Sequence, residues 1–146
     1  AQRAGLGLHA HDLVFGFMAL GDFARKGLGL LIEALGALPM HRGSAVRLLV
    51  IGGRQGEIAE FQSLAARHGV TDQIKFVGMQ RDVRPFLWAC DAFAFPSAYE
   101  IFSLAILQAA AAGLPVLVSK GLYGAEEFVE DGHNGWLVER EPDQLG

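Results

Sequence analysis

The 146-residue chain has the length of a single domain, and its 51% hydrophobic residues, 19 glycines and net charge of −4 exclude a disordered chain and argue against nucleic acid as a main partner. Cys90 is the only cysteine, which excludes an internal disulfide and a cysteine-based zinc site and fits a reducing compartment. No apolar run approaches the ~18 residues of a membrane span. We therefore expect a cytoplasmic protein.

Residues 1–12 show no clear hydrophobic period, which is typical of a linker remnant preceding a domain at 13–146. The apolar run at 13–18 predicts a buried strand. After a short loop, leucines and isoleucines recur from Leu28 at spacings of three and four, which predicts an amphipathic helix.

The loop before this helix contains a candidate anion site at Gly21, Arg25 and Lys26. Because the two cations are predicted at the helix start, their charges would oppose the helix dipole, and a bound diphosphate would offset that cost. A pair of solvated cations is the open alternative. A Walker A loop is excluded, because Lys26 precedes Gly27 instead of following a glycine.

Further strands are predicted at 46–51, 74–77, 91–95, 116–119 and close to Val138, and they alternate with helical segments. This alternation predicts an α/β fold with a Rossmann-like parallel sheet of about six strands and helices on both faces. The loop after the second strand contributes Gly53 to the predicted nucleotide site. A dinucleotide fingerprint fails there, since Ile51 occupies its first glycine position.

The most informative stretch, 95–115, is a strand end, a polar loop, a helix at 102–112 and a turn. Ligands of open α/β sheets bind outside the carboxyl ends of strands, so the predicted binding loop consists of Glu100, Ile101, Phe102, Ser103 and Leu104. The helix is apolar almost all round, which predicts burial between the sheet and its neighbours, and Gln108 within it needs a partner. Alternatively, Glu100 caps the helix and Gln108 bonds to a neighbouring loop.

The run PSAYEIFSLAILQAAAAGLPVLVS resembles the signature of glycosyltransferase family 4, whose members have the GT-B fold. That signature contains Pro-Ser, a glutamate, Phe, a small residue, Leu and a second glutamate eight residues after the first. Here the first is Glu100, whereas Gln108 occupies the second position. The resemblance implies that Glu100 contacts the donor hexose, that amides at 102–104 approach the sugar and diphosphate, and that position 108 binds the ribose.

The resemblance extends to Lys26 and Gly27, which match a Lys-Gly pair that binds the donor diphosphate in the family. The usual arginine position, five before the lysine, is Gly21, and Arg25 is the expected substitute. The sequence GDFARKG is similar to the corresponding sequence of the bacterial lipopolysaccharide-core glucosyltransferases of the family. No DxD sequence occurs, which agrees with stabilisation of the leaving group by the two cations without a metal ion or cofactor.

By this resemblance, the chain is the C-terminal donor-binding domain of a retaining glycosyltransferase that moves a hexose from a nucleotide diphosphate sugar, with UDP-hexose favoured, to a glycan or lipid-linked acceptor. The catalytic candidates are Glu100, Arg25 and Lys26. The acceptor site is expected in an absent N-terminal domain, so this fragment alone should be inactive, and the full-length protein could associate peripherally with the inner face of the membrane. The alternatives are a non-catalytic nucleotide-sugar-binding module and a GT-B sugar-nucleotide epimerase.

Overall fold

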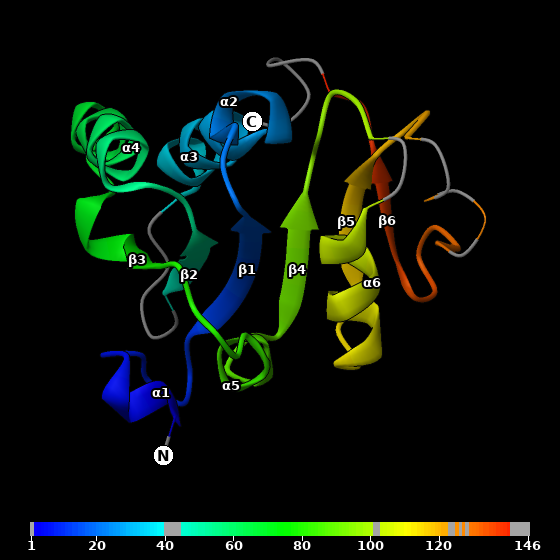
Figure 1. Ribbon diagram of the computed structural model, residues 1–146, viewed down its shortest axis with the longest axis horizontal. Coiled ribbons are helices and arrows are strands. Elements are labelled where there is room, and N and C mark those ends of the chain that lie inside the picture. Colours follow the sequence, from blue (N-terminus) through cyan, green and yellow to red (C-terminus); the bar gives the residue numbers. More distant parts are fainter. Residues whose placement is uncertain are drawn as a thin grey trace.

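The computed structural model describes residues 2–39, 45–100, 103–122, 125, 127 and 129–140, which form one six-stranded sheet with helices on both faces (Figure 1). The strand order is β3-β2-β1-β4-β5-β6, and every neighbouring pair is parallel. The predicted α/β class and six-stranded sheet are therefore confirmed. The strands are β1 (Leu13–Ala19), β2 (Val46–Gly52), β3 (Ile74–Gly78), β4 (Ala92–Phe95), β5 (Val116–Ser119) and β6 (Gly135–Val138).

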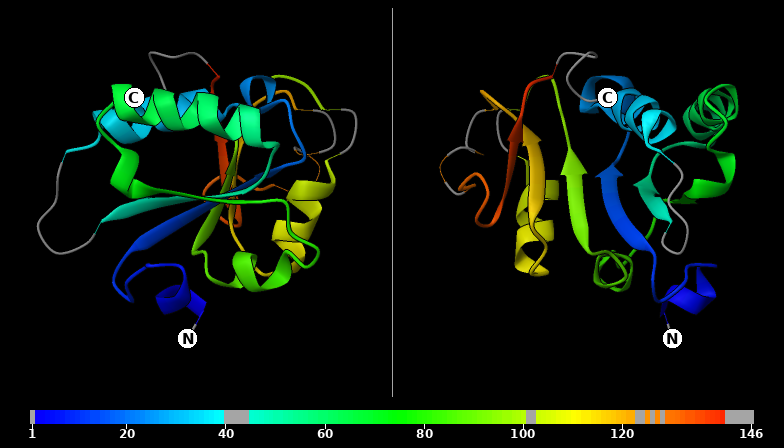
Figure 2. Two further views of the ribbon diagram at one scale, coloured as in Figure 1. Left: turned by 60° about the vertical axis from the view of Figure 1, so that its left-hand side comes forward. Right: turned by 180° about the vertical axis from the view of Figure 1, so that it is seen from behind.

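The direction of the strand connections decides which face of the sheet each helix covers. From β1 to β3 the chain moves one way across the sheet, and from β3 to β6 it moves the other way, so right-handed crossovers place α3 and α4 on one face and α5 and α6 on the other (Figure 2). Among the described residues, no helix is long and apolar enough to cross a membrane. The helices are α1 (Gln2–Gly5), α2 (Phe23–Lys26), α3 (Leu28–Ala37), α4 (Gln55–Arg67), α5 (Arg84–Trp88) and α6 (Leu104–Ala111), with a 3-10 turn at Thr71–Gln73.

An aromatic cluster in the core fixes the segment that follows β1. The ring of Phe23 packs edge-on against Phe17, with centroids 5.6 Å apart, and against Phe61, with centroids 5.5 Å apart. Both Phe17 and Phe23 are fully buried. Edge-to-face aromatic pairs add about 0.5–1.5 kcal/mol to the burial of their rings. The one-turn helix α2 is therefore anchored to the sheet by its first residue.

The loop cations lie in a different place from the one predicted. Arg25 and Lys26 form the last turn of α2, and Gly27, with a φ of 92°, separates this helix from α3. The prediction that the pair begins the longer helix and opposes its dipole is thus wrong. The break occurs because the left-handed conformation at Gly27 ends one helix before the next begins.

Helix α6 is less buried than its apolar composition predicted. Ile106 and Ala109 are buried against the sheet, but Leu104 is 67% exposed and Leu107 is 37% exposed. On this face of the sheet the helices form a single layer, so the sheet covers only the inward side of α6. The prediction of a helix buried all round was therefore wrong.

The N-terminal segment, which the sequence predicts to be a linker remnant, contacts the rest of the chain. It begins with α1, whose Arg3 donates a hydrogen bond to the Ala89 carbonyl at 2.9 Å and pairs with the Asp91 carboxylate at 2.9 Å. Asp91 also accepts a hydrogen bond from the Val14 N–H at 2.8 Å. These contacts join residues that are far apart in the chain, and local periodicity in the sequence does not predict such contacts.

Candidate active site

Lys26 and Glu100 meet where two adjacent parallel strands end. Lys26 lies in the segment after β1 and Glu100 in the loop after β4, and the lysine ammonium donates a hydrogen bond to the carboxylate. Their side chains are 18% and 8% exposed, so the ion pair is largely withdrawn from water. Removal of one partner from a buried ion pair lowers stability, because it leaves the other charge buried without a partner.

Two serines, one in the loop after β4 and one at the end of β5, support Glu100. The Ser97 hydroxyl donates to Oε1 of Glu100 at 3.1 Å, and the Ser119 hydroxyl donates to the Ser97 carbonyl. Both serines are buried, with 1% and 2% of their surface exposed. The carboxylate is therefore held by the Ser97 side chain, and the Ser97 backbone is held in turn by Ser119. Sequence reasoning missed both serines, although Ser97 is part of the Pro-Ser dipeptide that begins the quoted signature.

Arg25 lies at the mouth of the same site and is held by protein groups. Its Nε pairs with the Asp22 carboxylate at 2.6 Å, and a terminal nitrogen donates to the Tyr99 carbonyl at 2.5 Å. The hydrogen bond with Asp22 raises the pKa of Arg25 and lowers that of Asp22. The guanidinium is also 4.0 Å from the Glu100 carboxylate. To bind an anion, Arg25 would therefore have to release its contacts with Asp22 or with the Tyr99 carbonyl.

The sequence-predicted residues Arg25, Lys26 and Glu100 are thus brought together at the carboxyl edge of the sheet. The Lys26 ammonium also lies 5.4 Å from the centre of the Phe95 ring, a cation–π distance that restrains its position. Two cations beside one buried carboxylate can bind an anionic group while the carboxylate accepts hydrogen bonds from a neighbouring hydroxyl.

The two predicted glycines have different surroundings. Gly53 has a φ of 90°, and a Cβ there would lie 2.3 Å from the Phe23 ring, so packing alone requires glycine. At Gly21 a Cβ would meet only the Glu57 carboxylate, at 3.5 Å. That carboxylate accepts a hydrogen bond from the Phe23 backbone N–H and so helps to hold α2. Sequence reasoning missed Glu57, and ligand contacts for both glycines remain predictions.

The predicted binding loop is only partly described. Ile101 and Phe102 lie outside the described residues. Ser103 caps α6, because its hydroxyl accepts the Ile106 N–H at 3.2 Å, and Leu104 is exposed. The cap on this helix is therefore Ser103, and the alternative role of Glu100 as the cap is wrong.

Gln108 lies in a separate groove between α5 and α6. The side chain is exposed, contrary to the expectation of a residue inside an apolar element. The groove has a volume of about 280 Å³. Gln108 is thus available to a bound molecule, and its predicted ribose contact remains a prediction. The groove is lined by Val83, Arg84, Leu87, Trp88, Gln108, Ala111 and Ala112.

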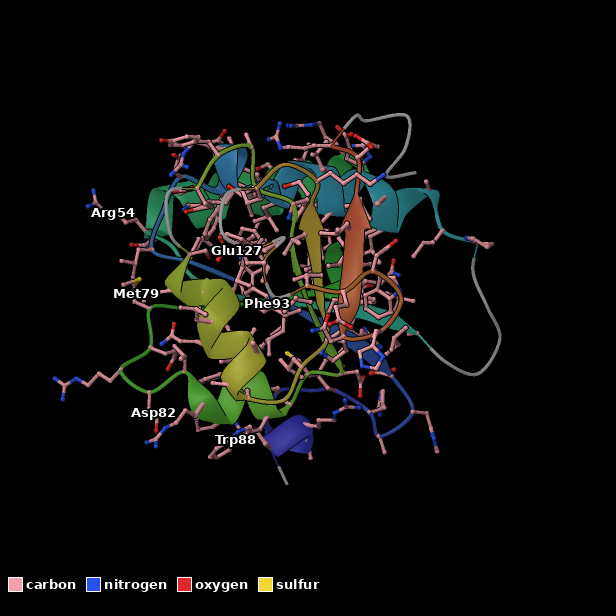
Figure 3. All side chains as sticks on the ribbon, turned by 90° about the vertical axis from the view of Figure 1, so that its right-hand side faces the viewer. Arg54, Met79, Asp82, Trp88, Phe93 and Glu127 are labelled. Carbon is pink, nitrogen blue, oxygen red and sulfur yellow. The ribbon has the colours of Figure 1, made fainter. Side chains whose placement is uncertain are left out.

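The loop between β3 and α5 borders this groove. In Figure 3, Met79 and Asp82 project from this loop along one edge of the molecule, and Trp88 follows them on α5. The Asp82 carboxylate accepts the Arg84 backbone N–H at 3.1 Å and pairs with its guanidinium at 2.9 Å. The hydrogen bond between the two side chains raises the pKa of Arg84 and lowers that of Asp82. The loop between β3 and α5 therefore lies on the surface beside Gln108.

Comparisons with known proteins identify relatives of this chain and its fold. The sequence pattern of the family described as glycosyl transferases group 1 matches residues 14–146. The chain is 39% identical over 123 residues to the lipopolysaccharide core biosynthesis glycosyltransferase LpsE of Rhizobium meliloti (strain 1021), covering 84% of this chain and 34% of LpsE. It is 32% identical over 117 residues to the lipopolysaccharide glucosyltransferase WaaG of Escherichia coli (strain K12), covering 80% of this chain and 30% of WaaG.

Solved structures show the same fold. The crystal structure of WaaG superposes with a TM-score of 0.82 at 28% identity, covering 99% of this chain and 38% of that one. The structure of Anabaena Alr3699/HepE in complex with UDP and glucose superposes with a TM-score of 0.83 at 33% identity, covering 98% of this chain and 39% of HepE. The chain therefore spans only about a third of the length of the relatives it matches.

Proposed function

We propose, since the chain belongs to the glycosyl transferases group 1 family, that it binds the nucleotide diphosphate sugar from which a glycosyltransferase takes its sugar. The observation that carries the proposal is the junction of Lys26, Arg25 and Glu100 at the carboxyl edge of the sheet, where α/β proteins bind ligands. The complexes of HepE with UDP and with UDP-glucose support a uridine diphosphate sugar as the donor.

In this proposal each residue has a separate task. Lys26 and Arg25 bind the diphosphate, and their charge stabilises the leaving UDP as the glycosidic bond to the sugar breaks. Glu100 accepts hydrogen bonds from hexose hydroxyls, and Gln108 binds the ribose. The proposed reaction retains the configuration at the anomeric carbon and needs no metal ion.

The rest of the reaction is assigned to other parts of the protein. We propose a glycan or lipid-linked acceptor, bound by a separate N-terminal domain, with residues 13–146 forming the donor domain. Because catalysis requires an acceptor positioned against the donor, the 146-residue chain alone should not transfer sugar. The proposed location is the cytoplasm, at or near the inner face of the membrane.

A binding panel tests the proposal. The 146-residue chain is titrated with UDP, GDP and ADP, each alone and as the glucose conjugate, and the dissociation constants are compared. The expected result is binding of a nucleoside diphosphate that is weakened in Lys26→Ala and unchanged in Lys75→Ala, which replaces an exposed lysine on β3. Equal loss in both variants, or no binding to any nucleotide, would reject the assignment.

A further inference from the structure

We propose that Arg140 is a positioning residue that holds the loops of Lys26 and Glu100 in register for the diphosphate, an inference that rests on the proposed function. Arg140 lies just beyond β6, at the same edge of the sheet as the site. Neither composition nor the family signature singled it out.

The side chain of Arg140 bridges two loops that are distant in the sequence. Its Nε donates to the Pro96 carbonyl at 3.0 Å, and a terminal nitrogen lies 3.5 Å from the Arg25 carbonyl. Pro96 belongs to the loop after β4 that carries Glu100, and Arg25 directly precedes Lys26. One guanidinium therefore contacts the main chain on both sides of the ion pair.

Those two carbonyls lie where the loops touch. The Ala98 N–H donates to the Arg25 carbonyl at 2.9 Å. A Cβ at Gly27 would lie 2.3 Å from the Pro96 carbonyl oxygen, so the backbones are in direct contact there. A cation that donates to both carbonyls at this contact stabilises the arrangement of the two loops.

Arginine suits this task better than lysine. Its planar guanidinium presents several N–H groups in a fixed fork and can reach two acceptors at once, whereas an ammonium is a point charge on a flexible stem. Arg140 is half-buried, and its neighbour Glu139 pairs instead with Lys120 at 3.0 Å. The guanidinium is therefore directed to the loop carbonyls and not to the adjacent carboxylate.

The consequence is a specific effect on binding. Without Arg140 the junction keeps the Ala98 hydrogen bond but loses the contact that fixes Pro96, so the loop after β4 can move relative to α2. Lys26 and Glu100 would then remain present but less well placed. Such a loss of positioning lowers the affinity for the ligand without removing any group that contacts it.

Two variants and one control test this inference. Arg140→Ala removes the bridge, Arg140→Lys keeps the charge without the fork, and Lys120→Ala removes a neighbouring exposed cation at the end of β5. For each, the amide resonances of Ala98 and Gly27 are recorded without nucleotide, and the melting temperature and the dissociation constant for UDP are measured.

With Arg140→Ala we expect shifted amide resonances at both positions and UDP binding weakened about tenfold, the size of one lost charged hydrogen bond. Arg140→Lys should keep the wild-type melting temperature, yet bind UDP several-fold more weakly than the wild type. Lys120→Ala should match the wild type in all three measurements.

Unchanged amide resonances and unchanged UDP affinity in Arg140→Ala would overturn the inference. If Arg140→Ala does not fold, full recovery of UDP affinity in Arg140→Lys would overturn it as well, because charge alone would then suffice. Failure of the wild type to bind UDP would reject the proposed function instead. In that case the amide shifts in the free chain still decide whether Arg140 positions the loops.

Discussion

The Lys26 ammonium is hydrogen-bonded to the Glu100 carboxylate, so the residue proposed to bind the diphosphate is paired with the residue proposed to bind the hexose. Ser97 donates a hydrogen bond to the carboxylate, and Ser119 donates one to the Ser97 carbonyl. A diphosphate must therefore compete with Glu100 for Lys26, and binding of the anion would leave the carboxylate free to accept hydrogen bonds from the sugar.

This competition predicts opposite effects of Glu100→Gln on two ligands. The neutral amide pairs less strongly with Lys26, so the affinity for UDP should rise a few-fold. The additional affinity for UDP-glucose over UDP should fall, because a carboxylate accepts stronger hydrogen bonds from sugar hydroxyls than an amide does. Calorimetric titration with both ligands gives the two dissociation constants. If their ratio is the same as in the wild type, Glu100 does not contact the hexose.

Gln108→Ala should leave stability unchanged and weaken nucleotide binding. The side chain is exposed in the groove beside Trp88, so its removal strands no buried group. If Gln108 binds the ribose, the wild type should prefer UDP to 2′-deoxy-UDP, and the variant should bind the two equally. The melting temperature and both affinities are measured together. A wild-type preference that survives the substitution would remove Gln108 from the site.

Gly27→Ala should destabilise the fold more than Gly113→Ala, which is its matched control. Both glycines have a positive φ, of 92° and 81°, so alanine strains the backbone at each by about 1–2 kcal/mol. Only at Gly27 would the new Cβ meet the Pro96 backbone, whereas nothing lies within 4 Å of one at Gly113. We expect an extra loss of about 1–3 kcal/mol in the free energy of unfolding at Gly27. Equal losses in denaturant titrations would show that the loops separate freely.

Much of the fold could be predicted from the sequence because its signals are local. Short apolar runs separated by helical periods indicate a parallel sheet, and the carboxyl ends of such strands share one edge. This geometry is what places Lys26 and Glu100 together although 74 residues separate them. Pattern and topology were sufficient for these two residues.

The supporting contacts could not be predicted in this way. The partners of Ser119, Glu57 and Arg140 lie in distant segments of the chain, and residue spacing in the sequence does not indicate such contacts. The apolar composition of α6 could not show which of its faces is covered, and the break between α2 and α3 depends on the conformation of Gly27. Each of these features is decided by tertiary packing.

Cys90 should be unreactive in the folded chain. Burial, together with the charge of Asp91, raises the pKa of its thiol from 9.0 to about 12. Because the folded state holds its proton more tightly than the unfolded state, this group makes unfolding easier as the pH rises from about 9 to 12. Alkylation by iodoacetamide at pH 8 should be slow in buffer and fast in denaturant. Rapid alkylation of the folded chain would show that the thiol is accessible and its pKa ordinary.

This chain should bind a nucleoside diphosphate through its cations without a metal ion, which calorimetric titration with UDP in the presence of EDTA can decide. We predict one UDP bound per chain, with the same affinity when magnesium replaces EDTA. In Lys26→Ala the affinity should fall about 10–100-fold, equivalent to ~1.5–3 kcal/mol for a hydrogen bond to a charged group. Absence of binding in EDTA, with binding restored by magnesium or manganese, would contradict the claim.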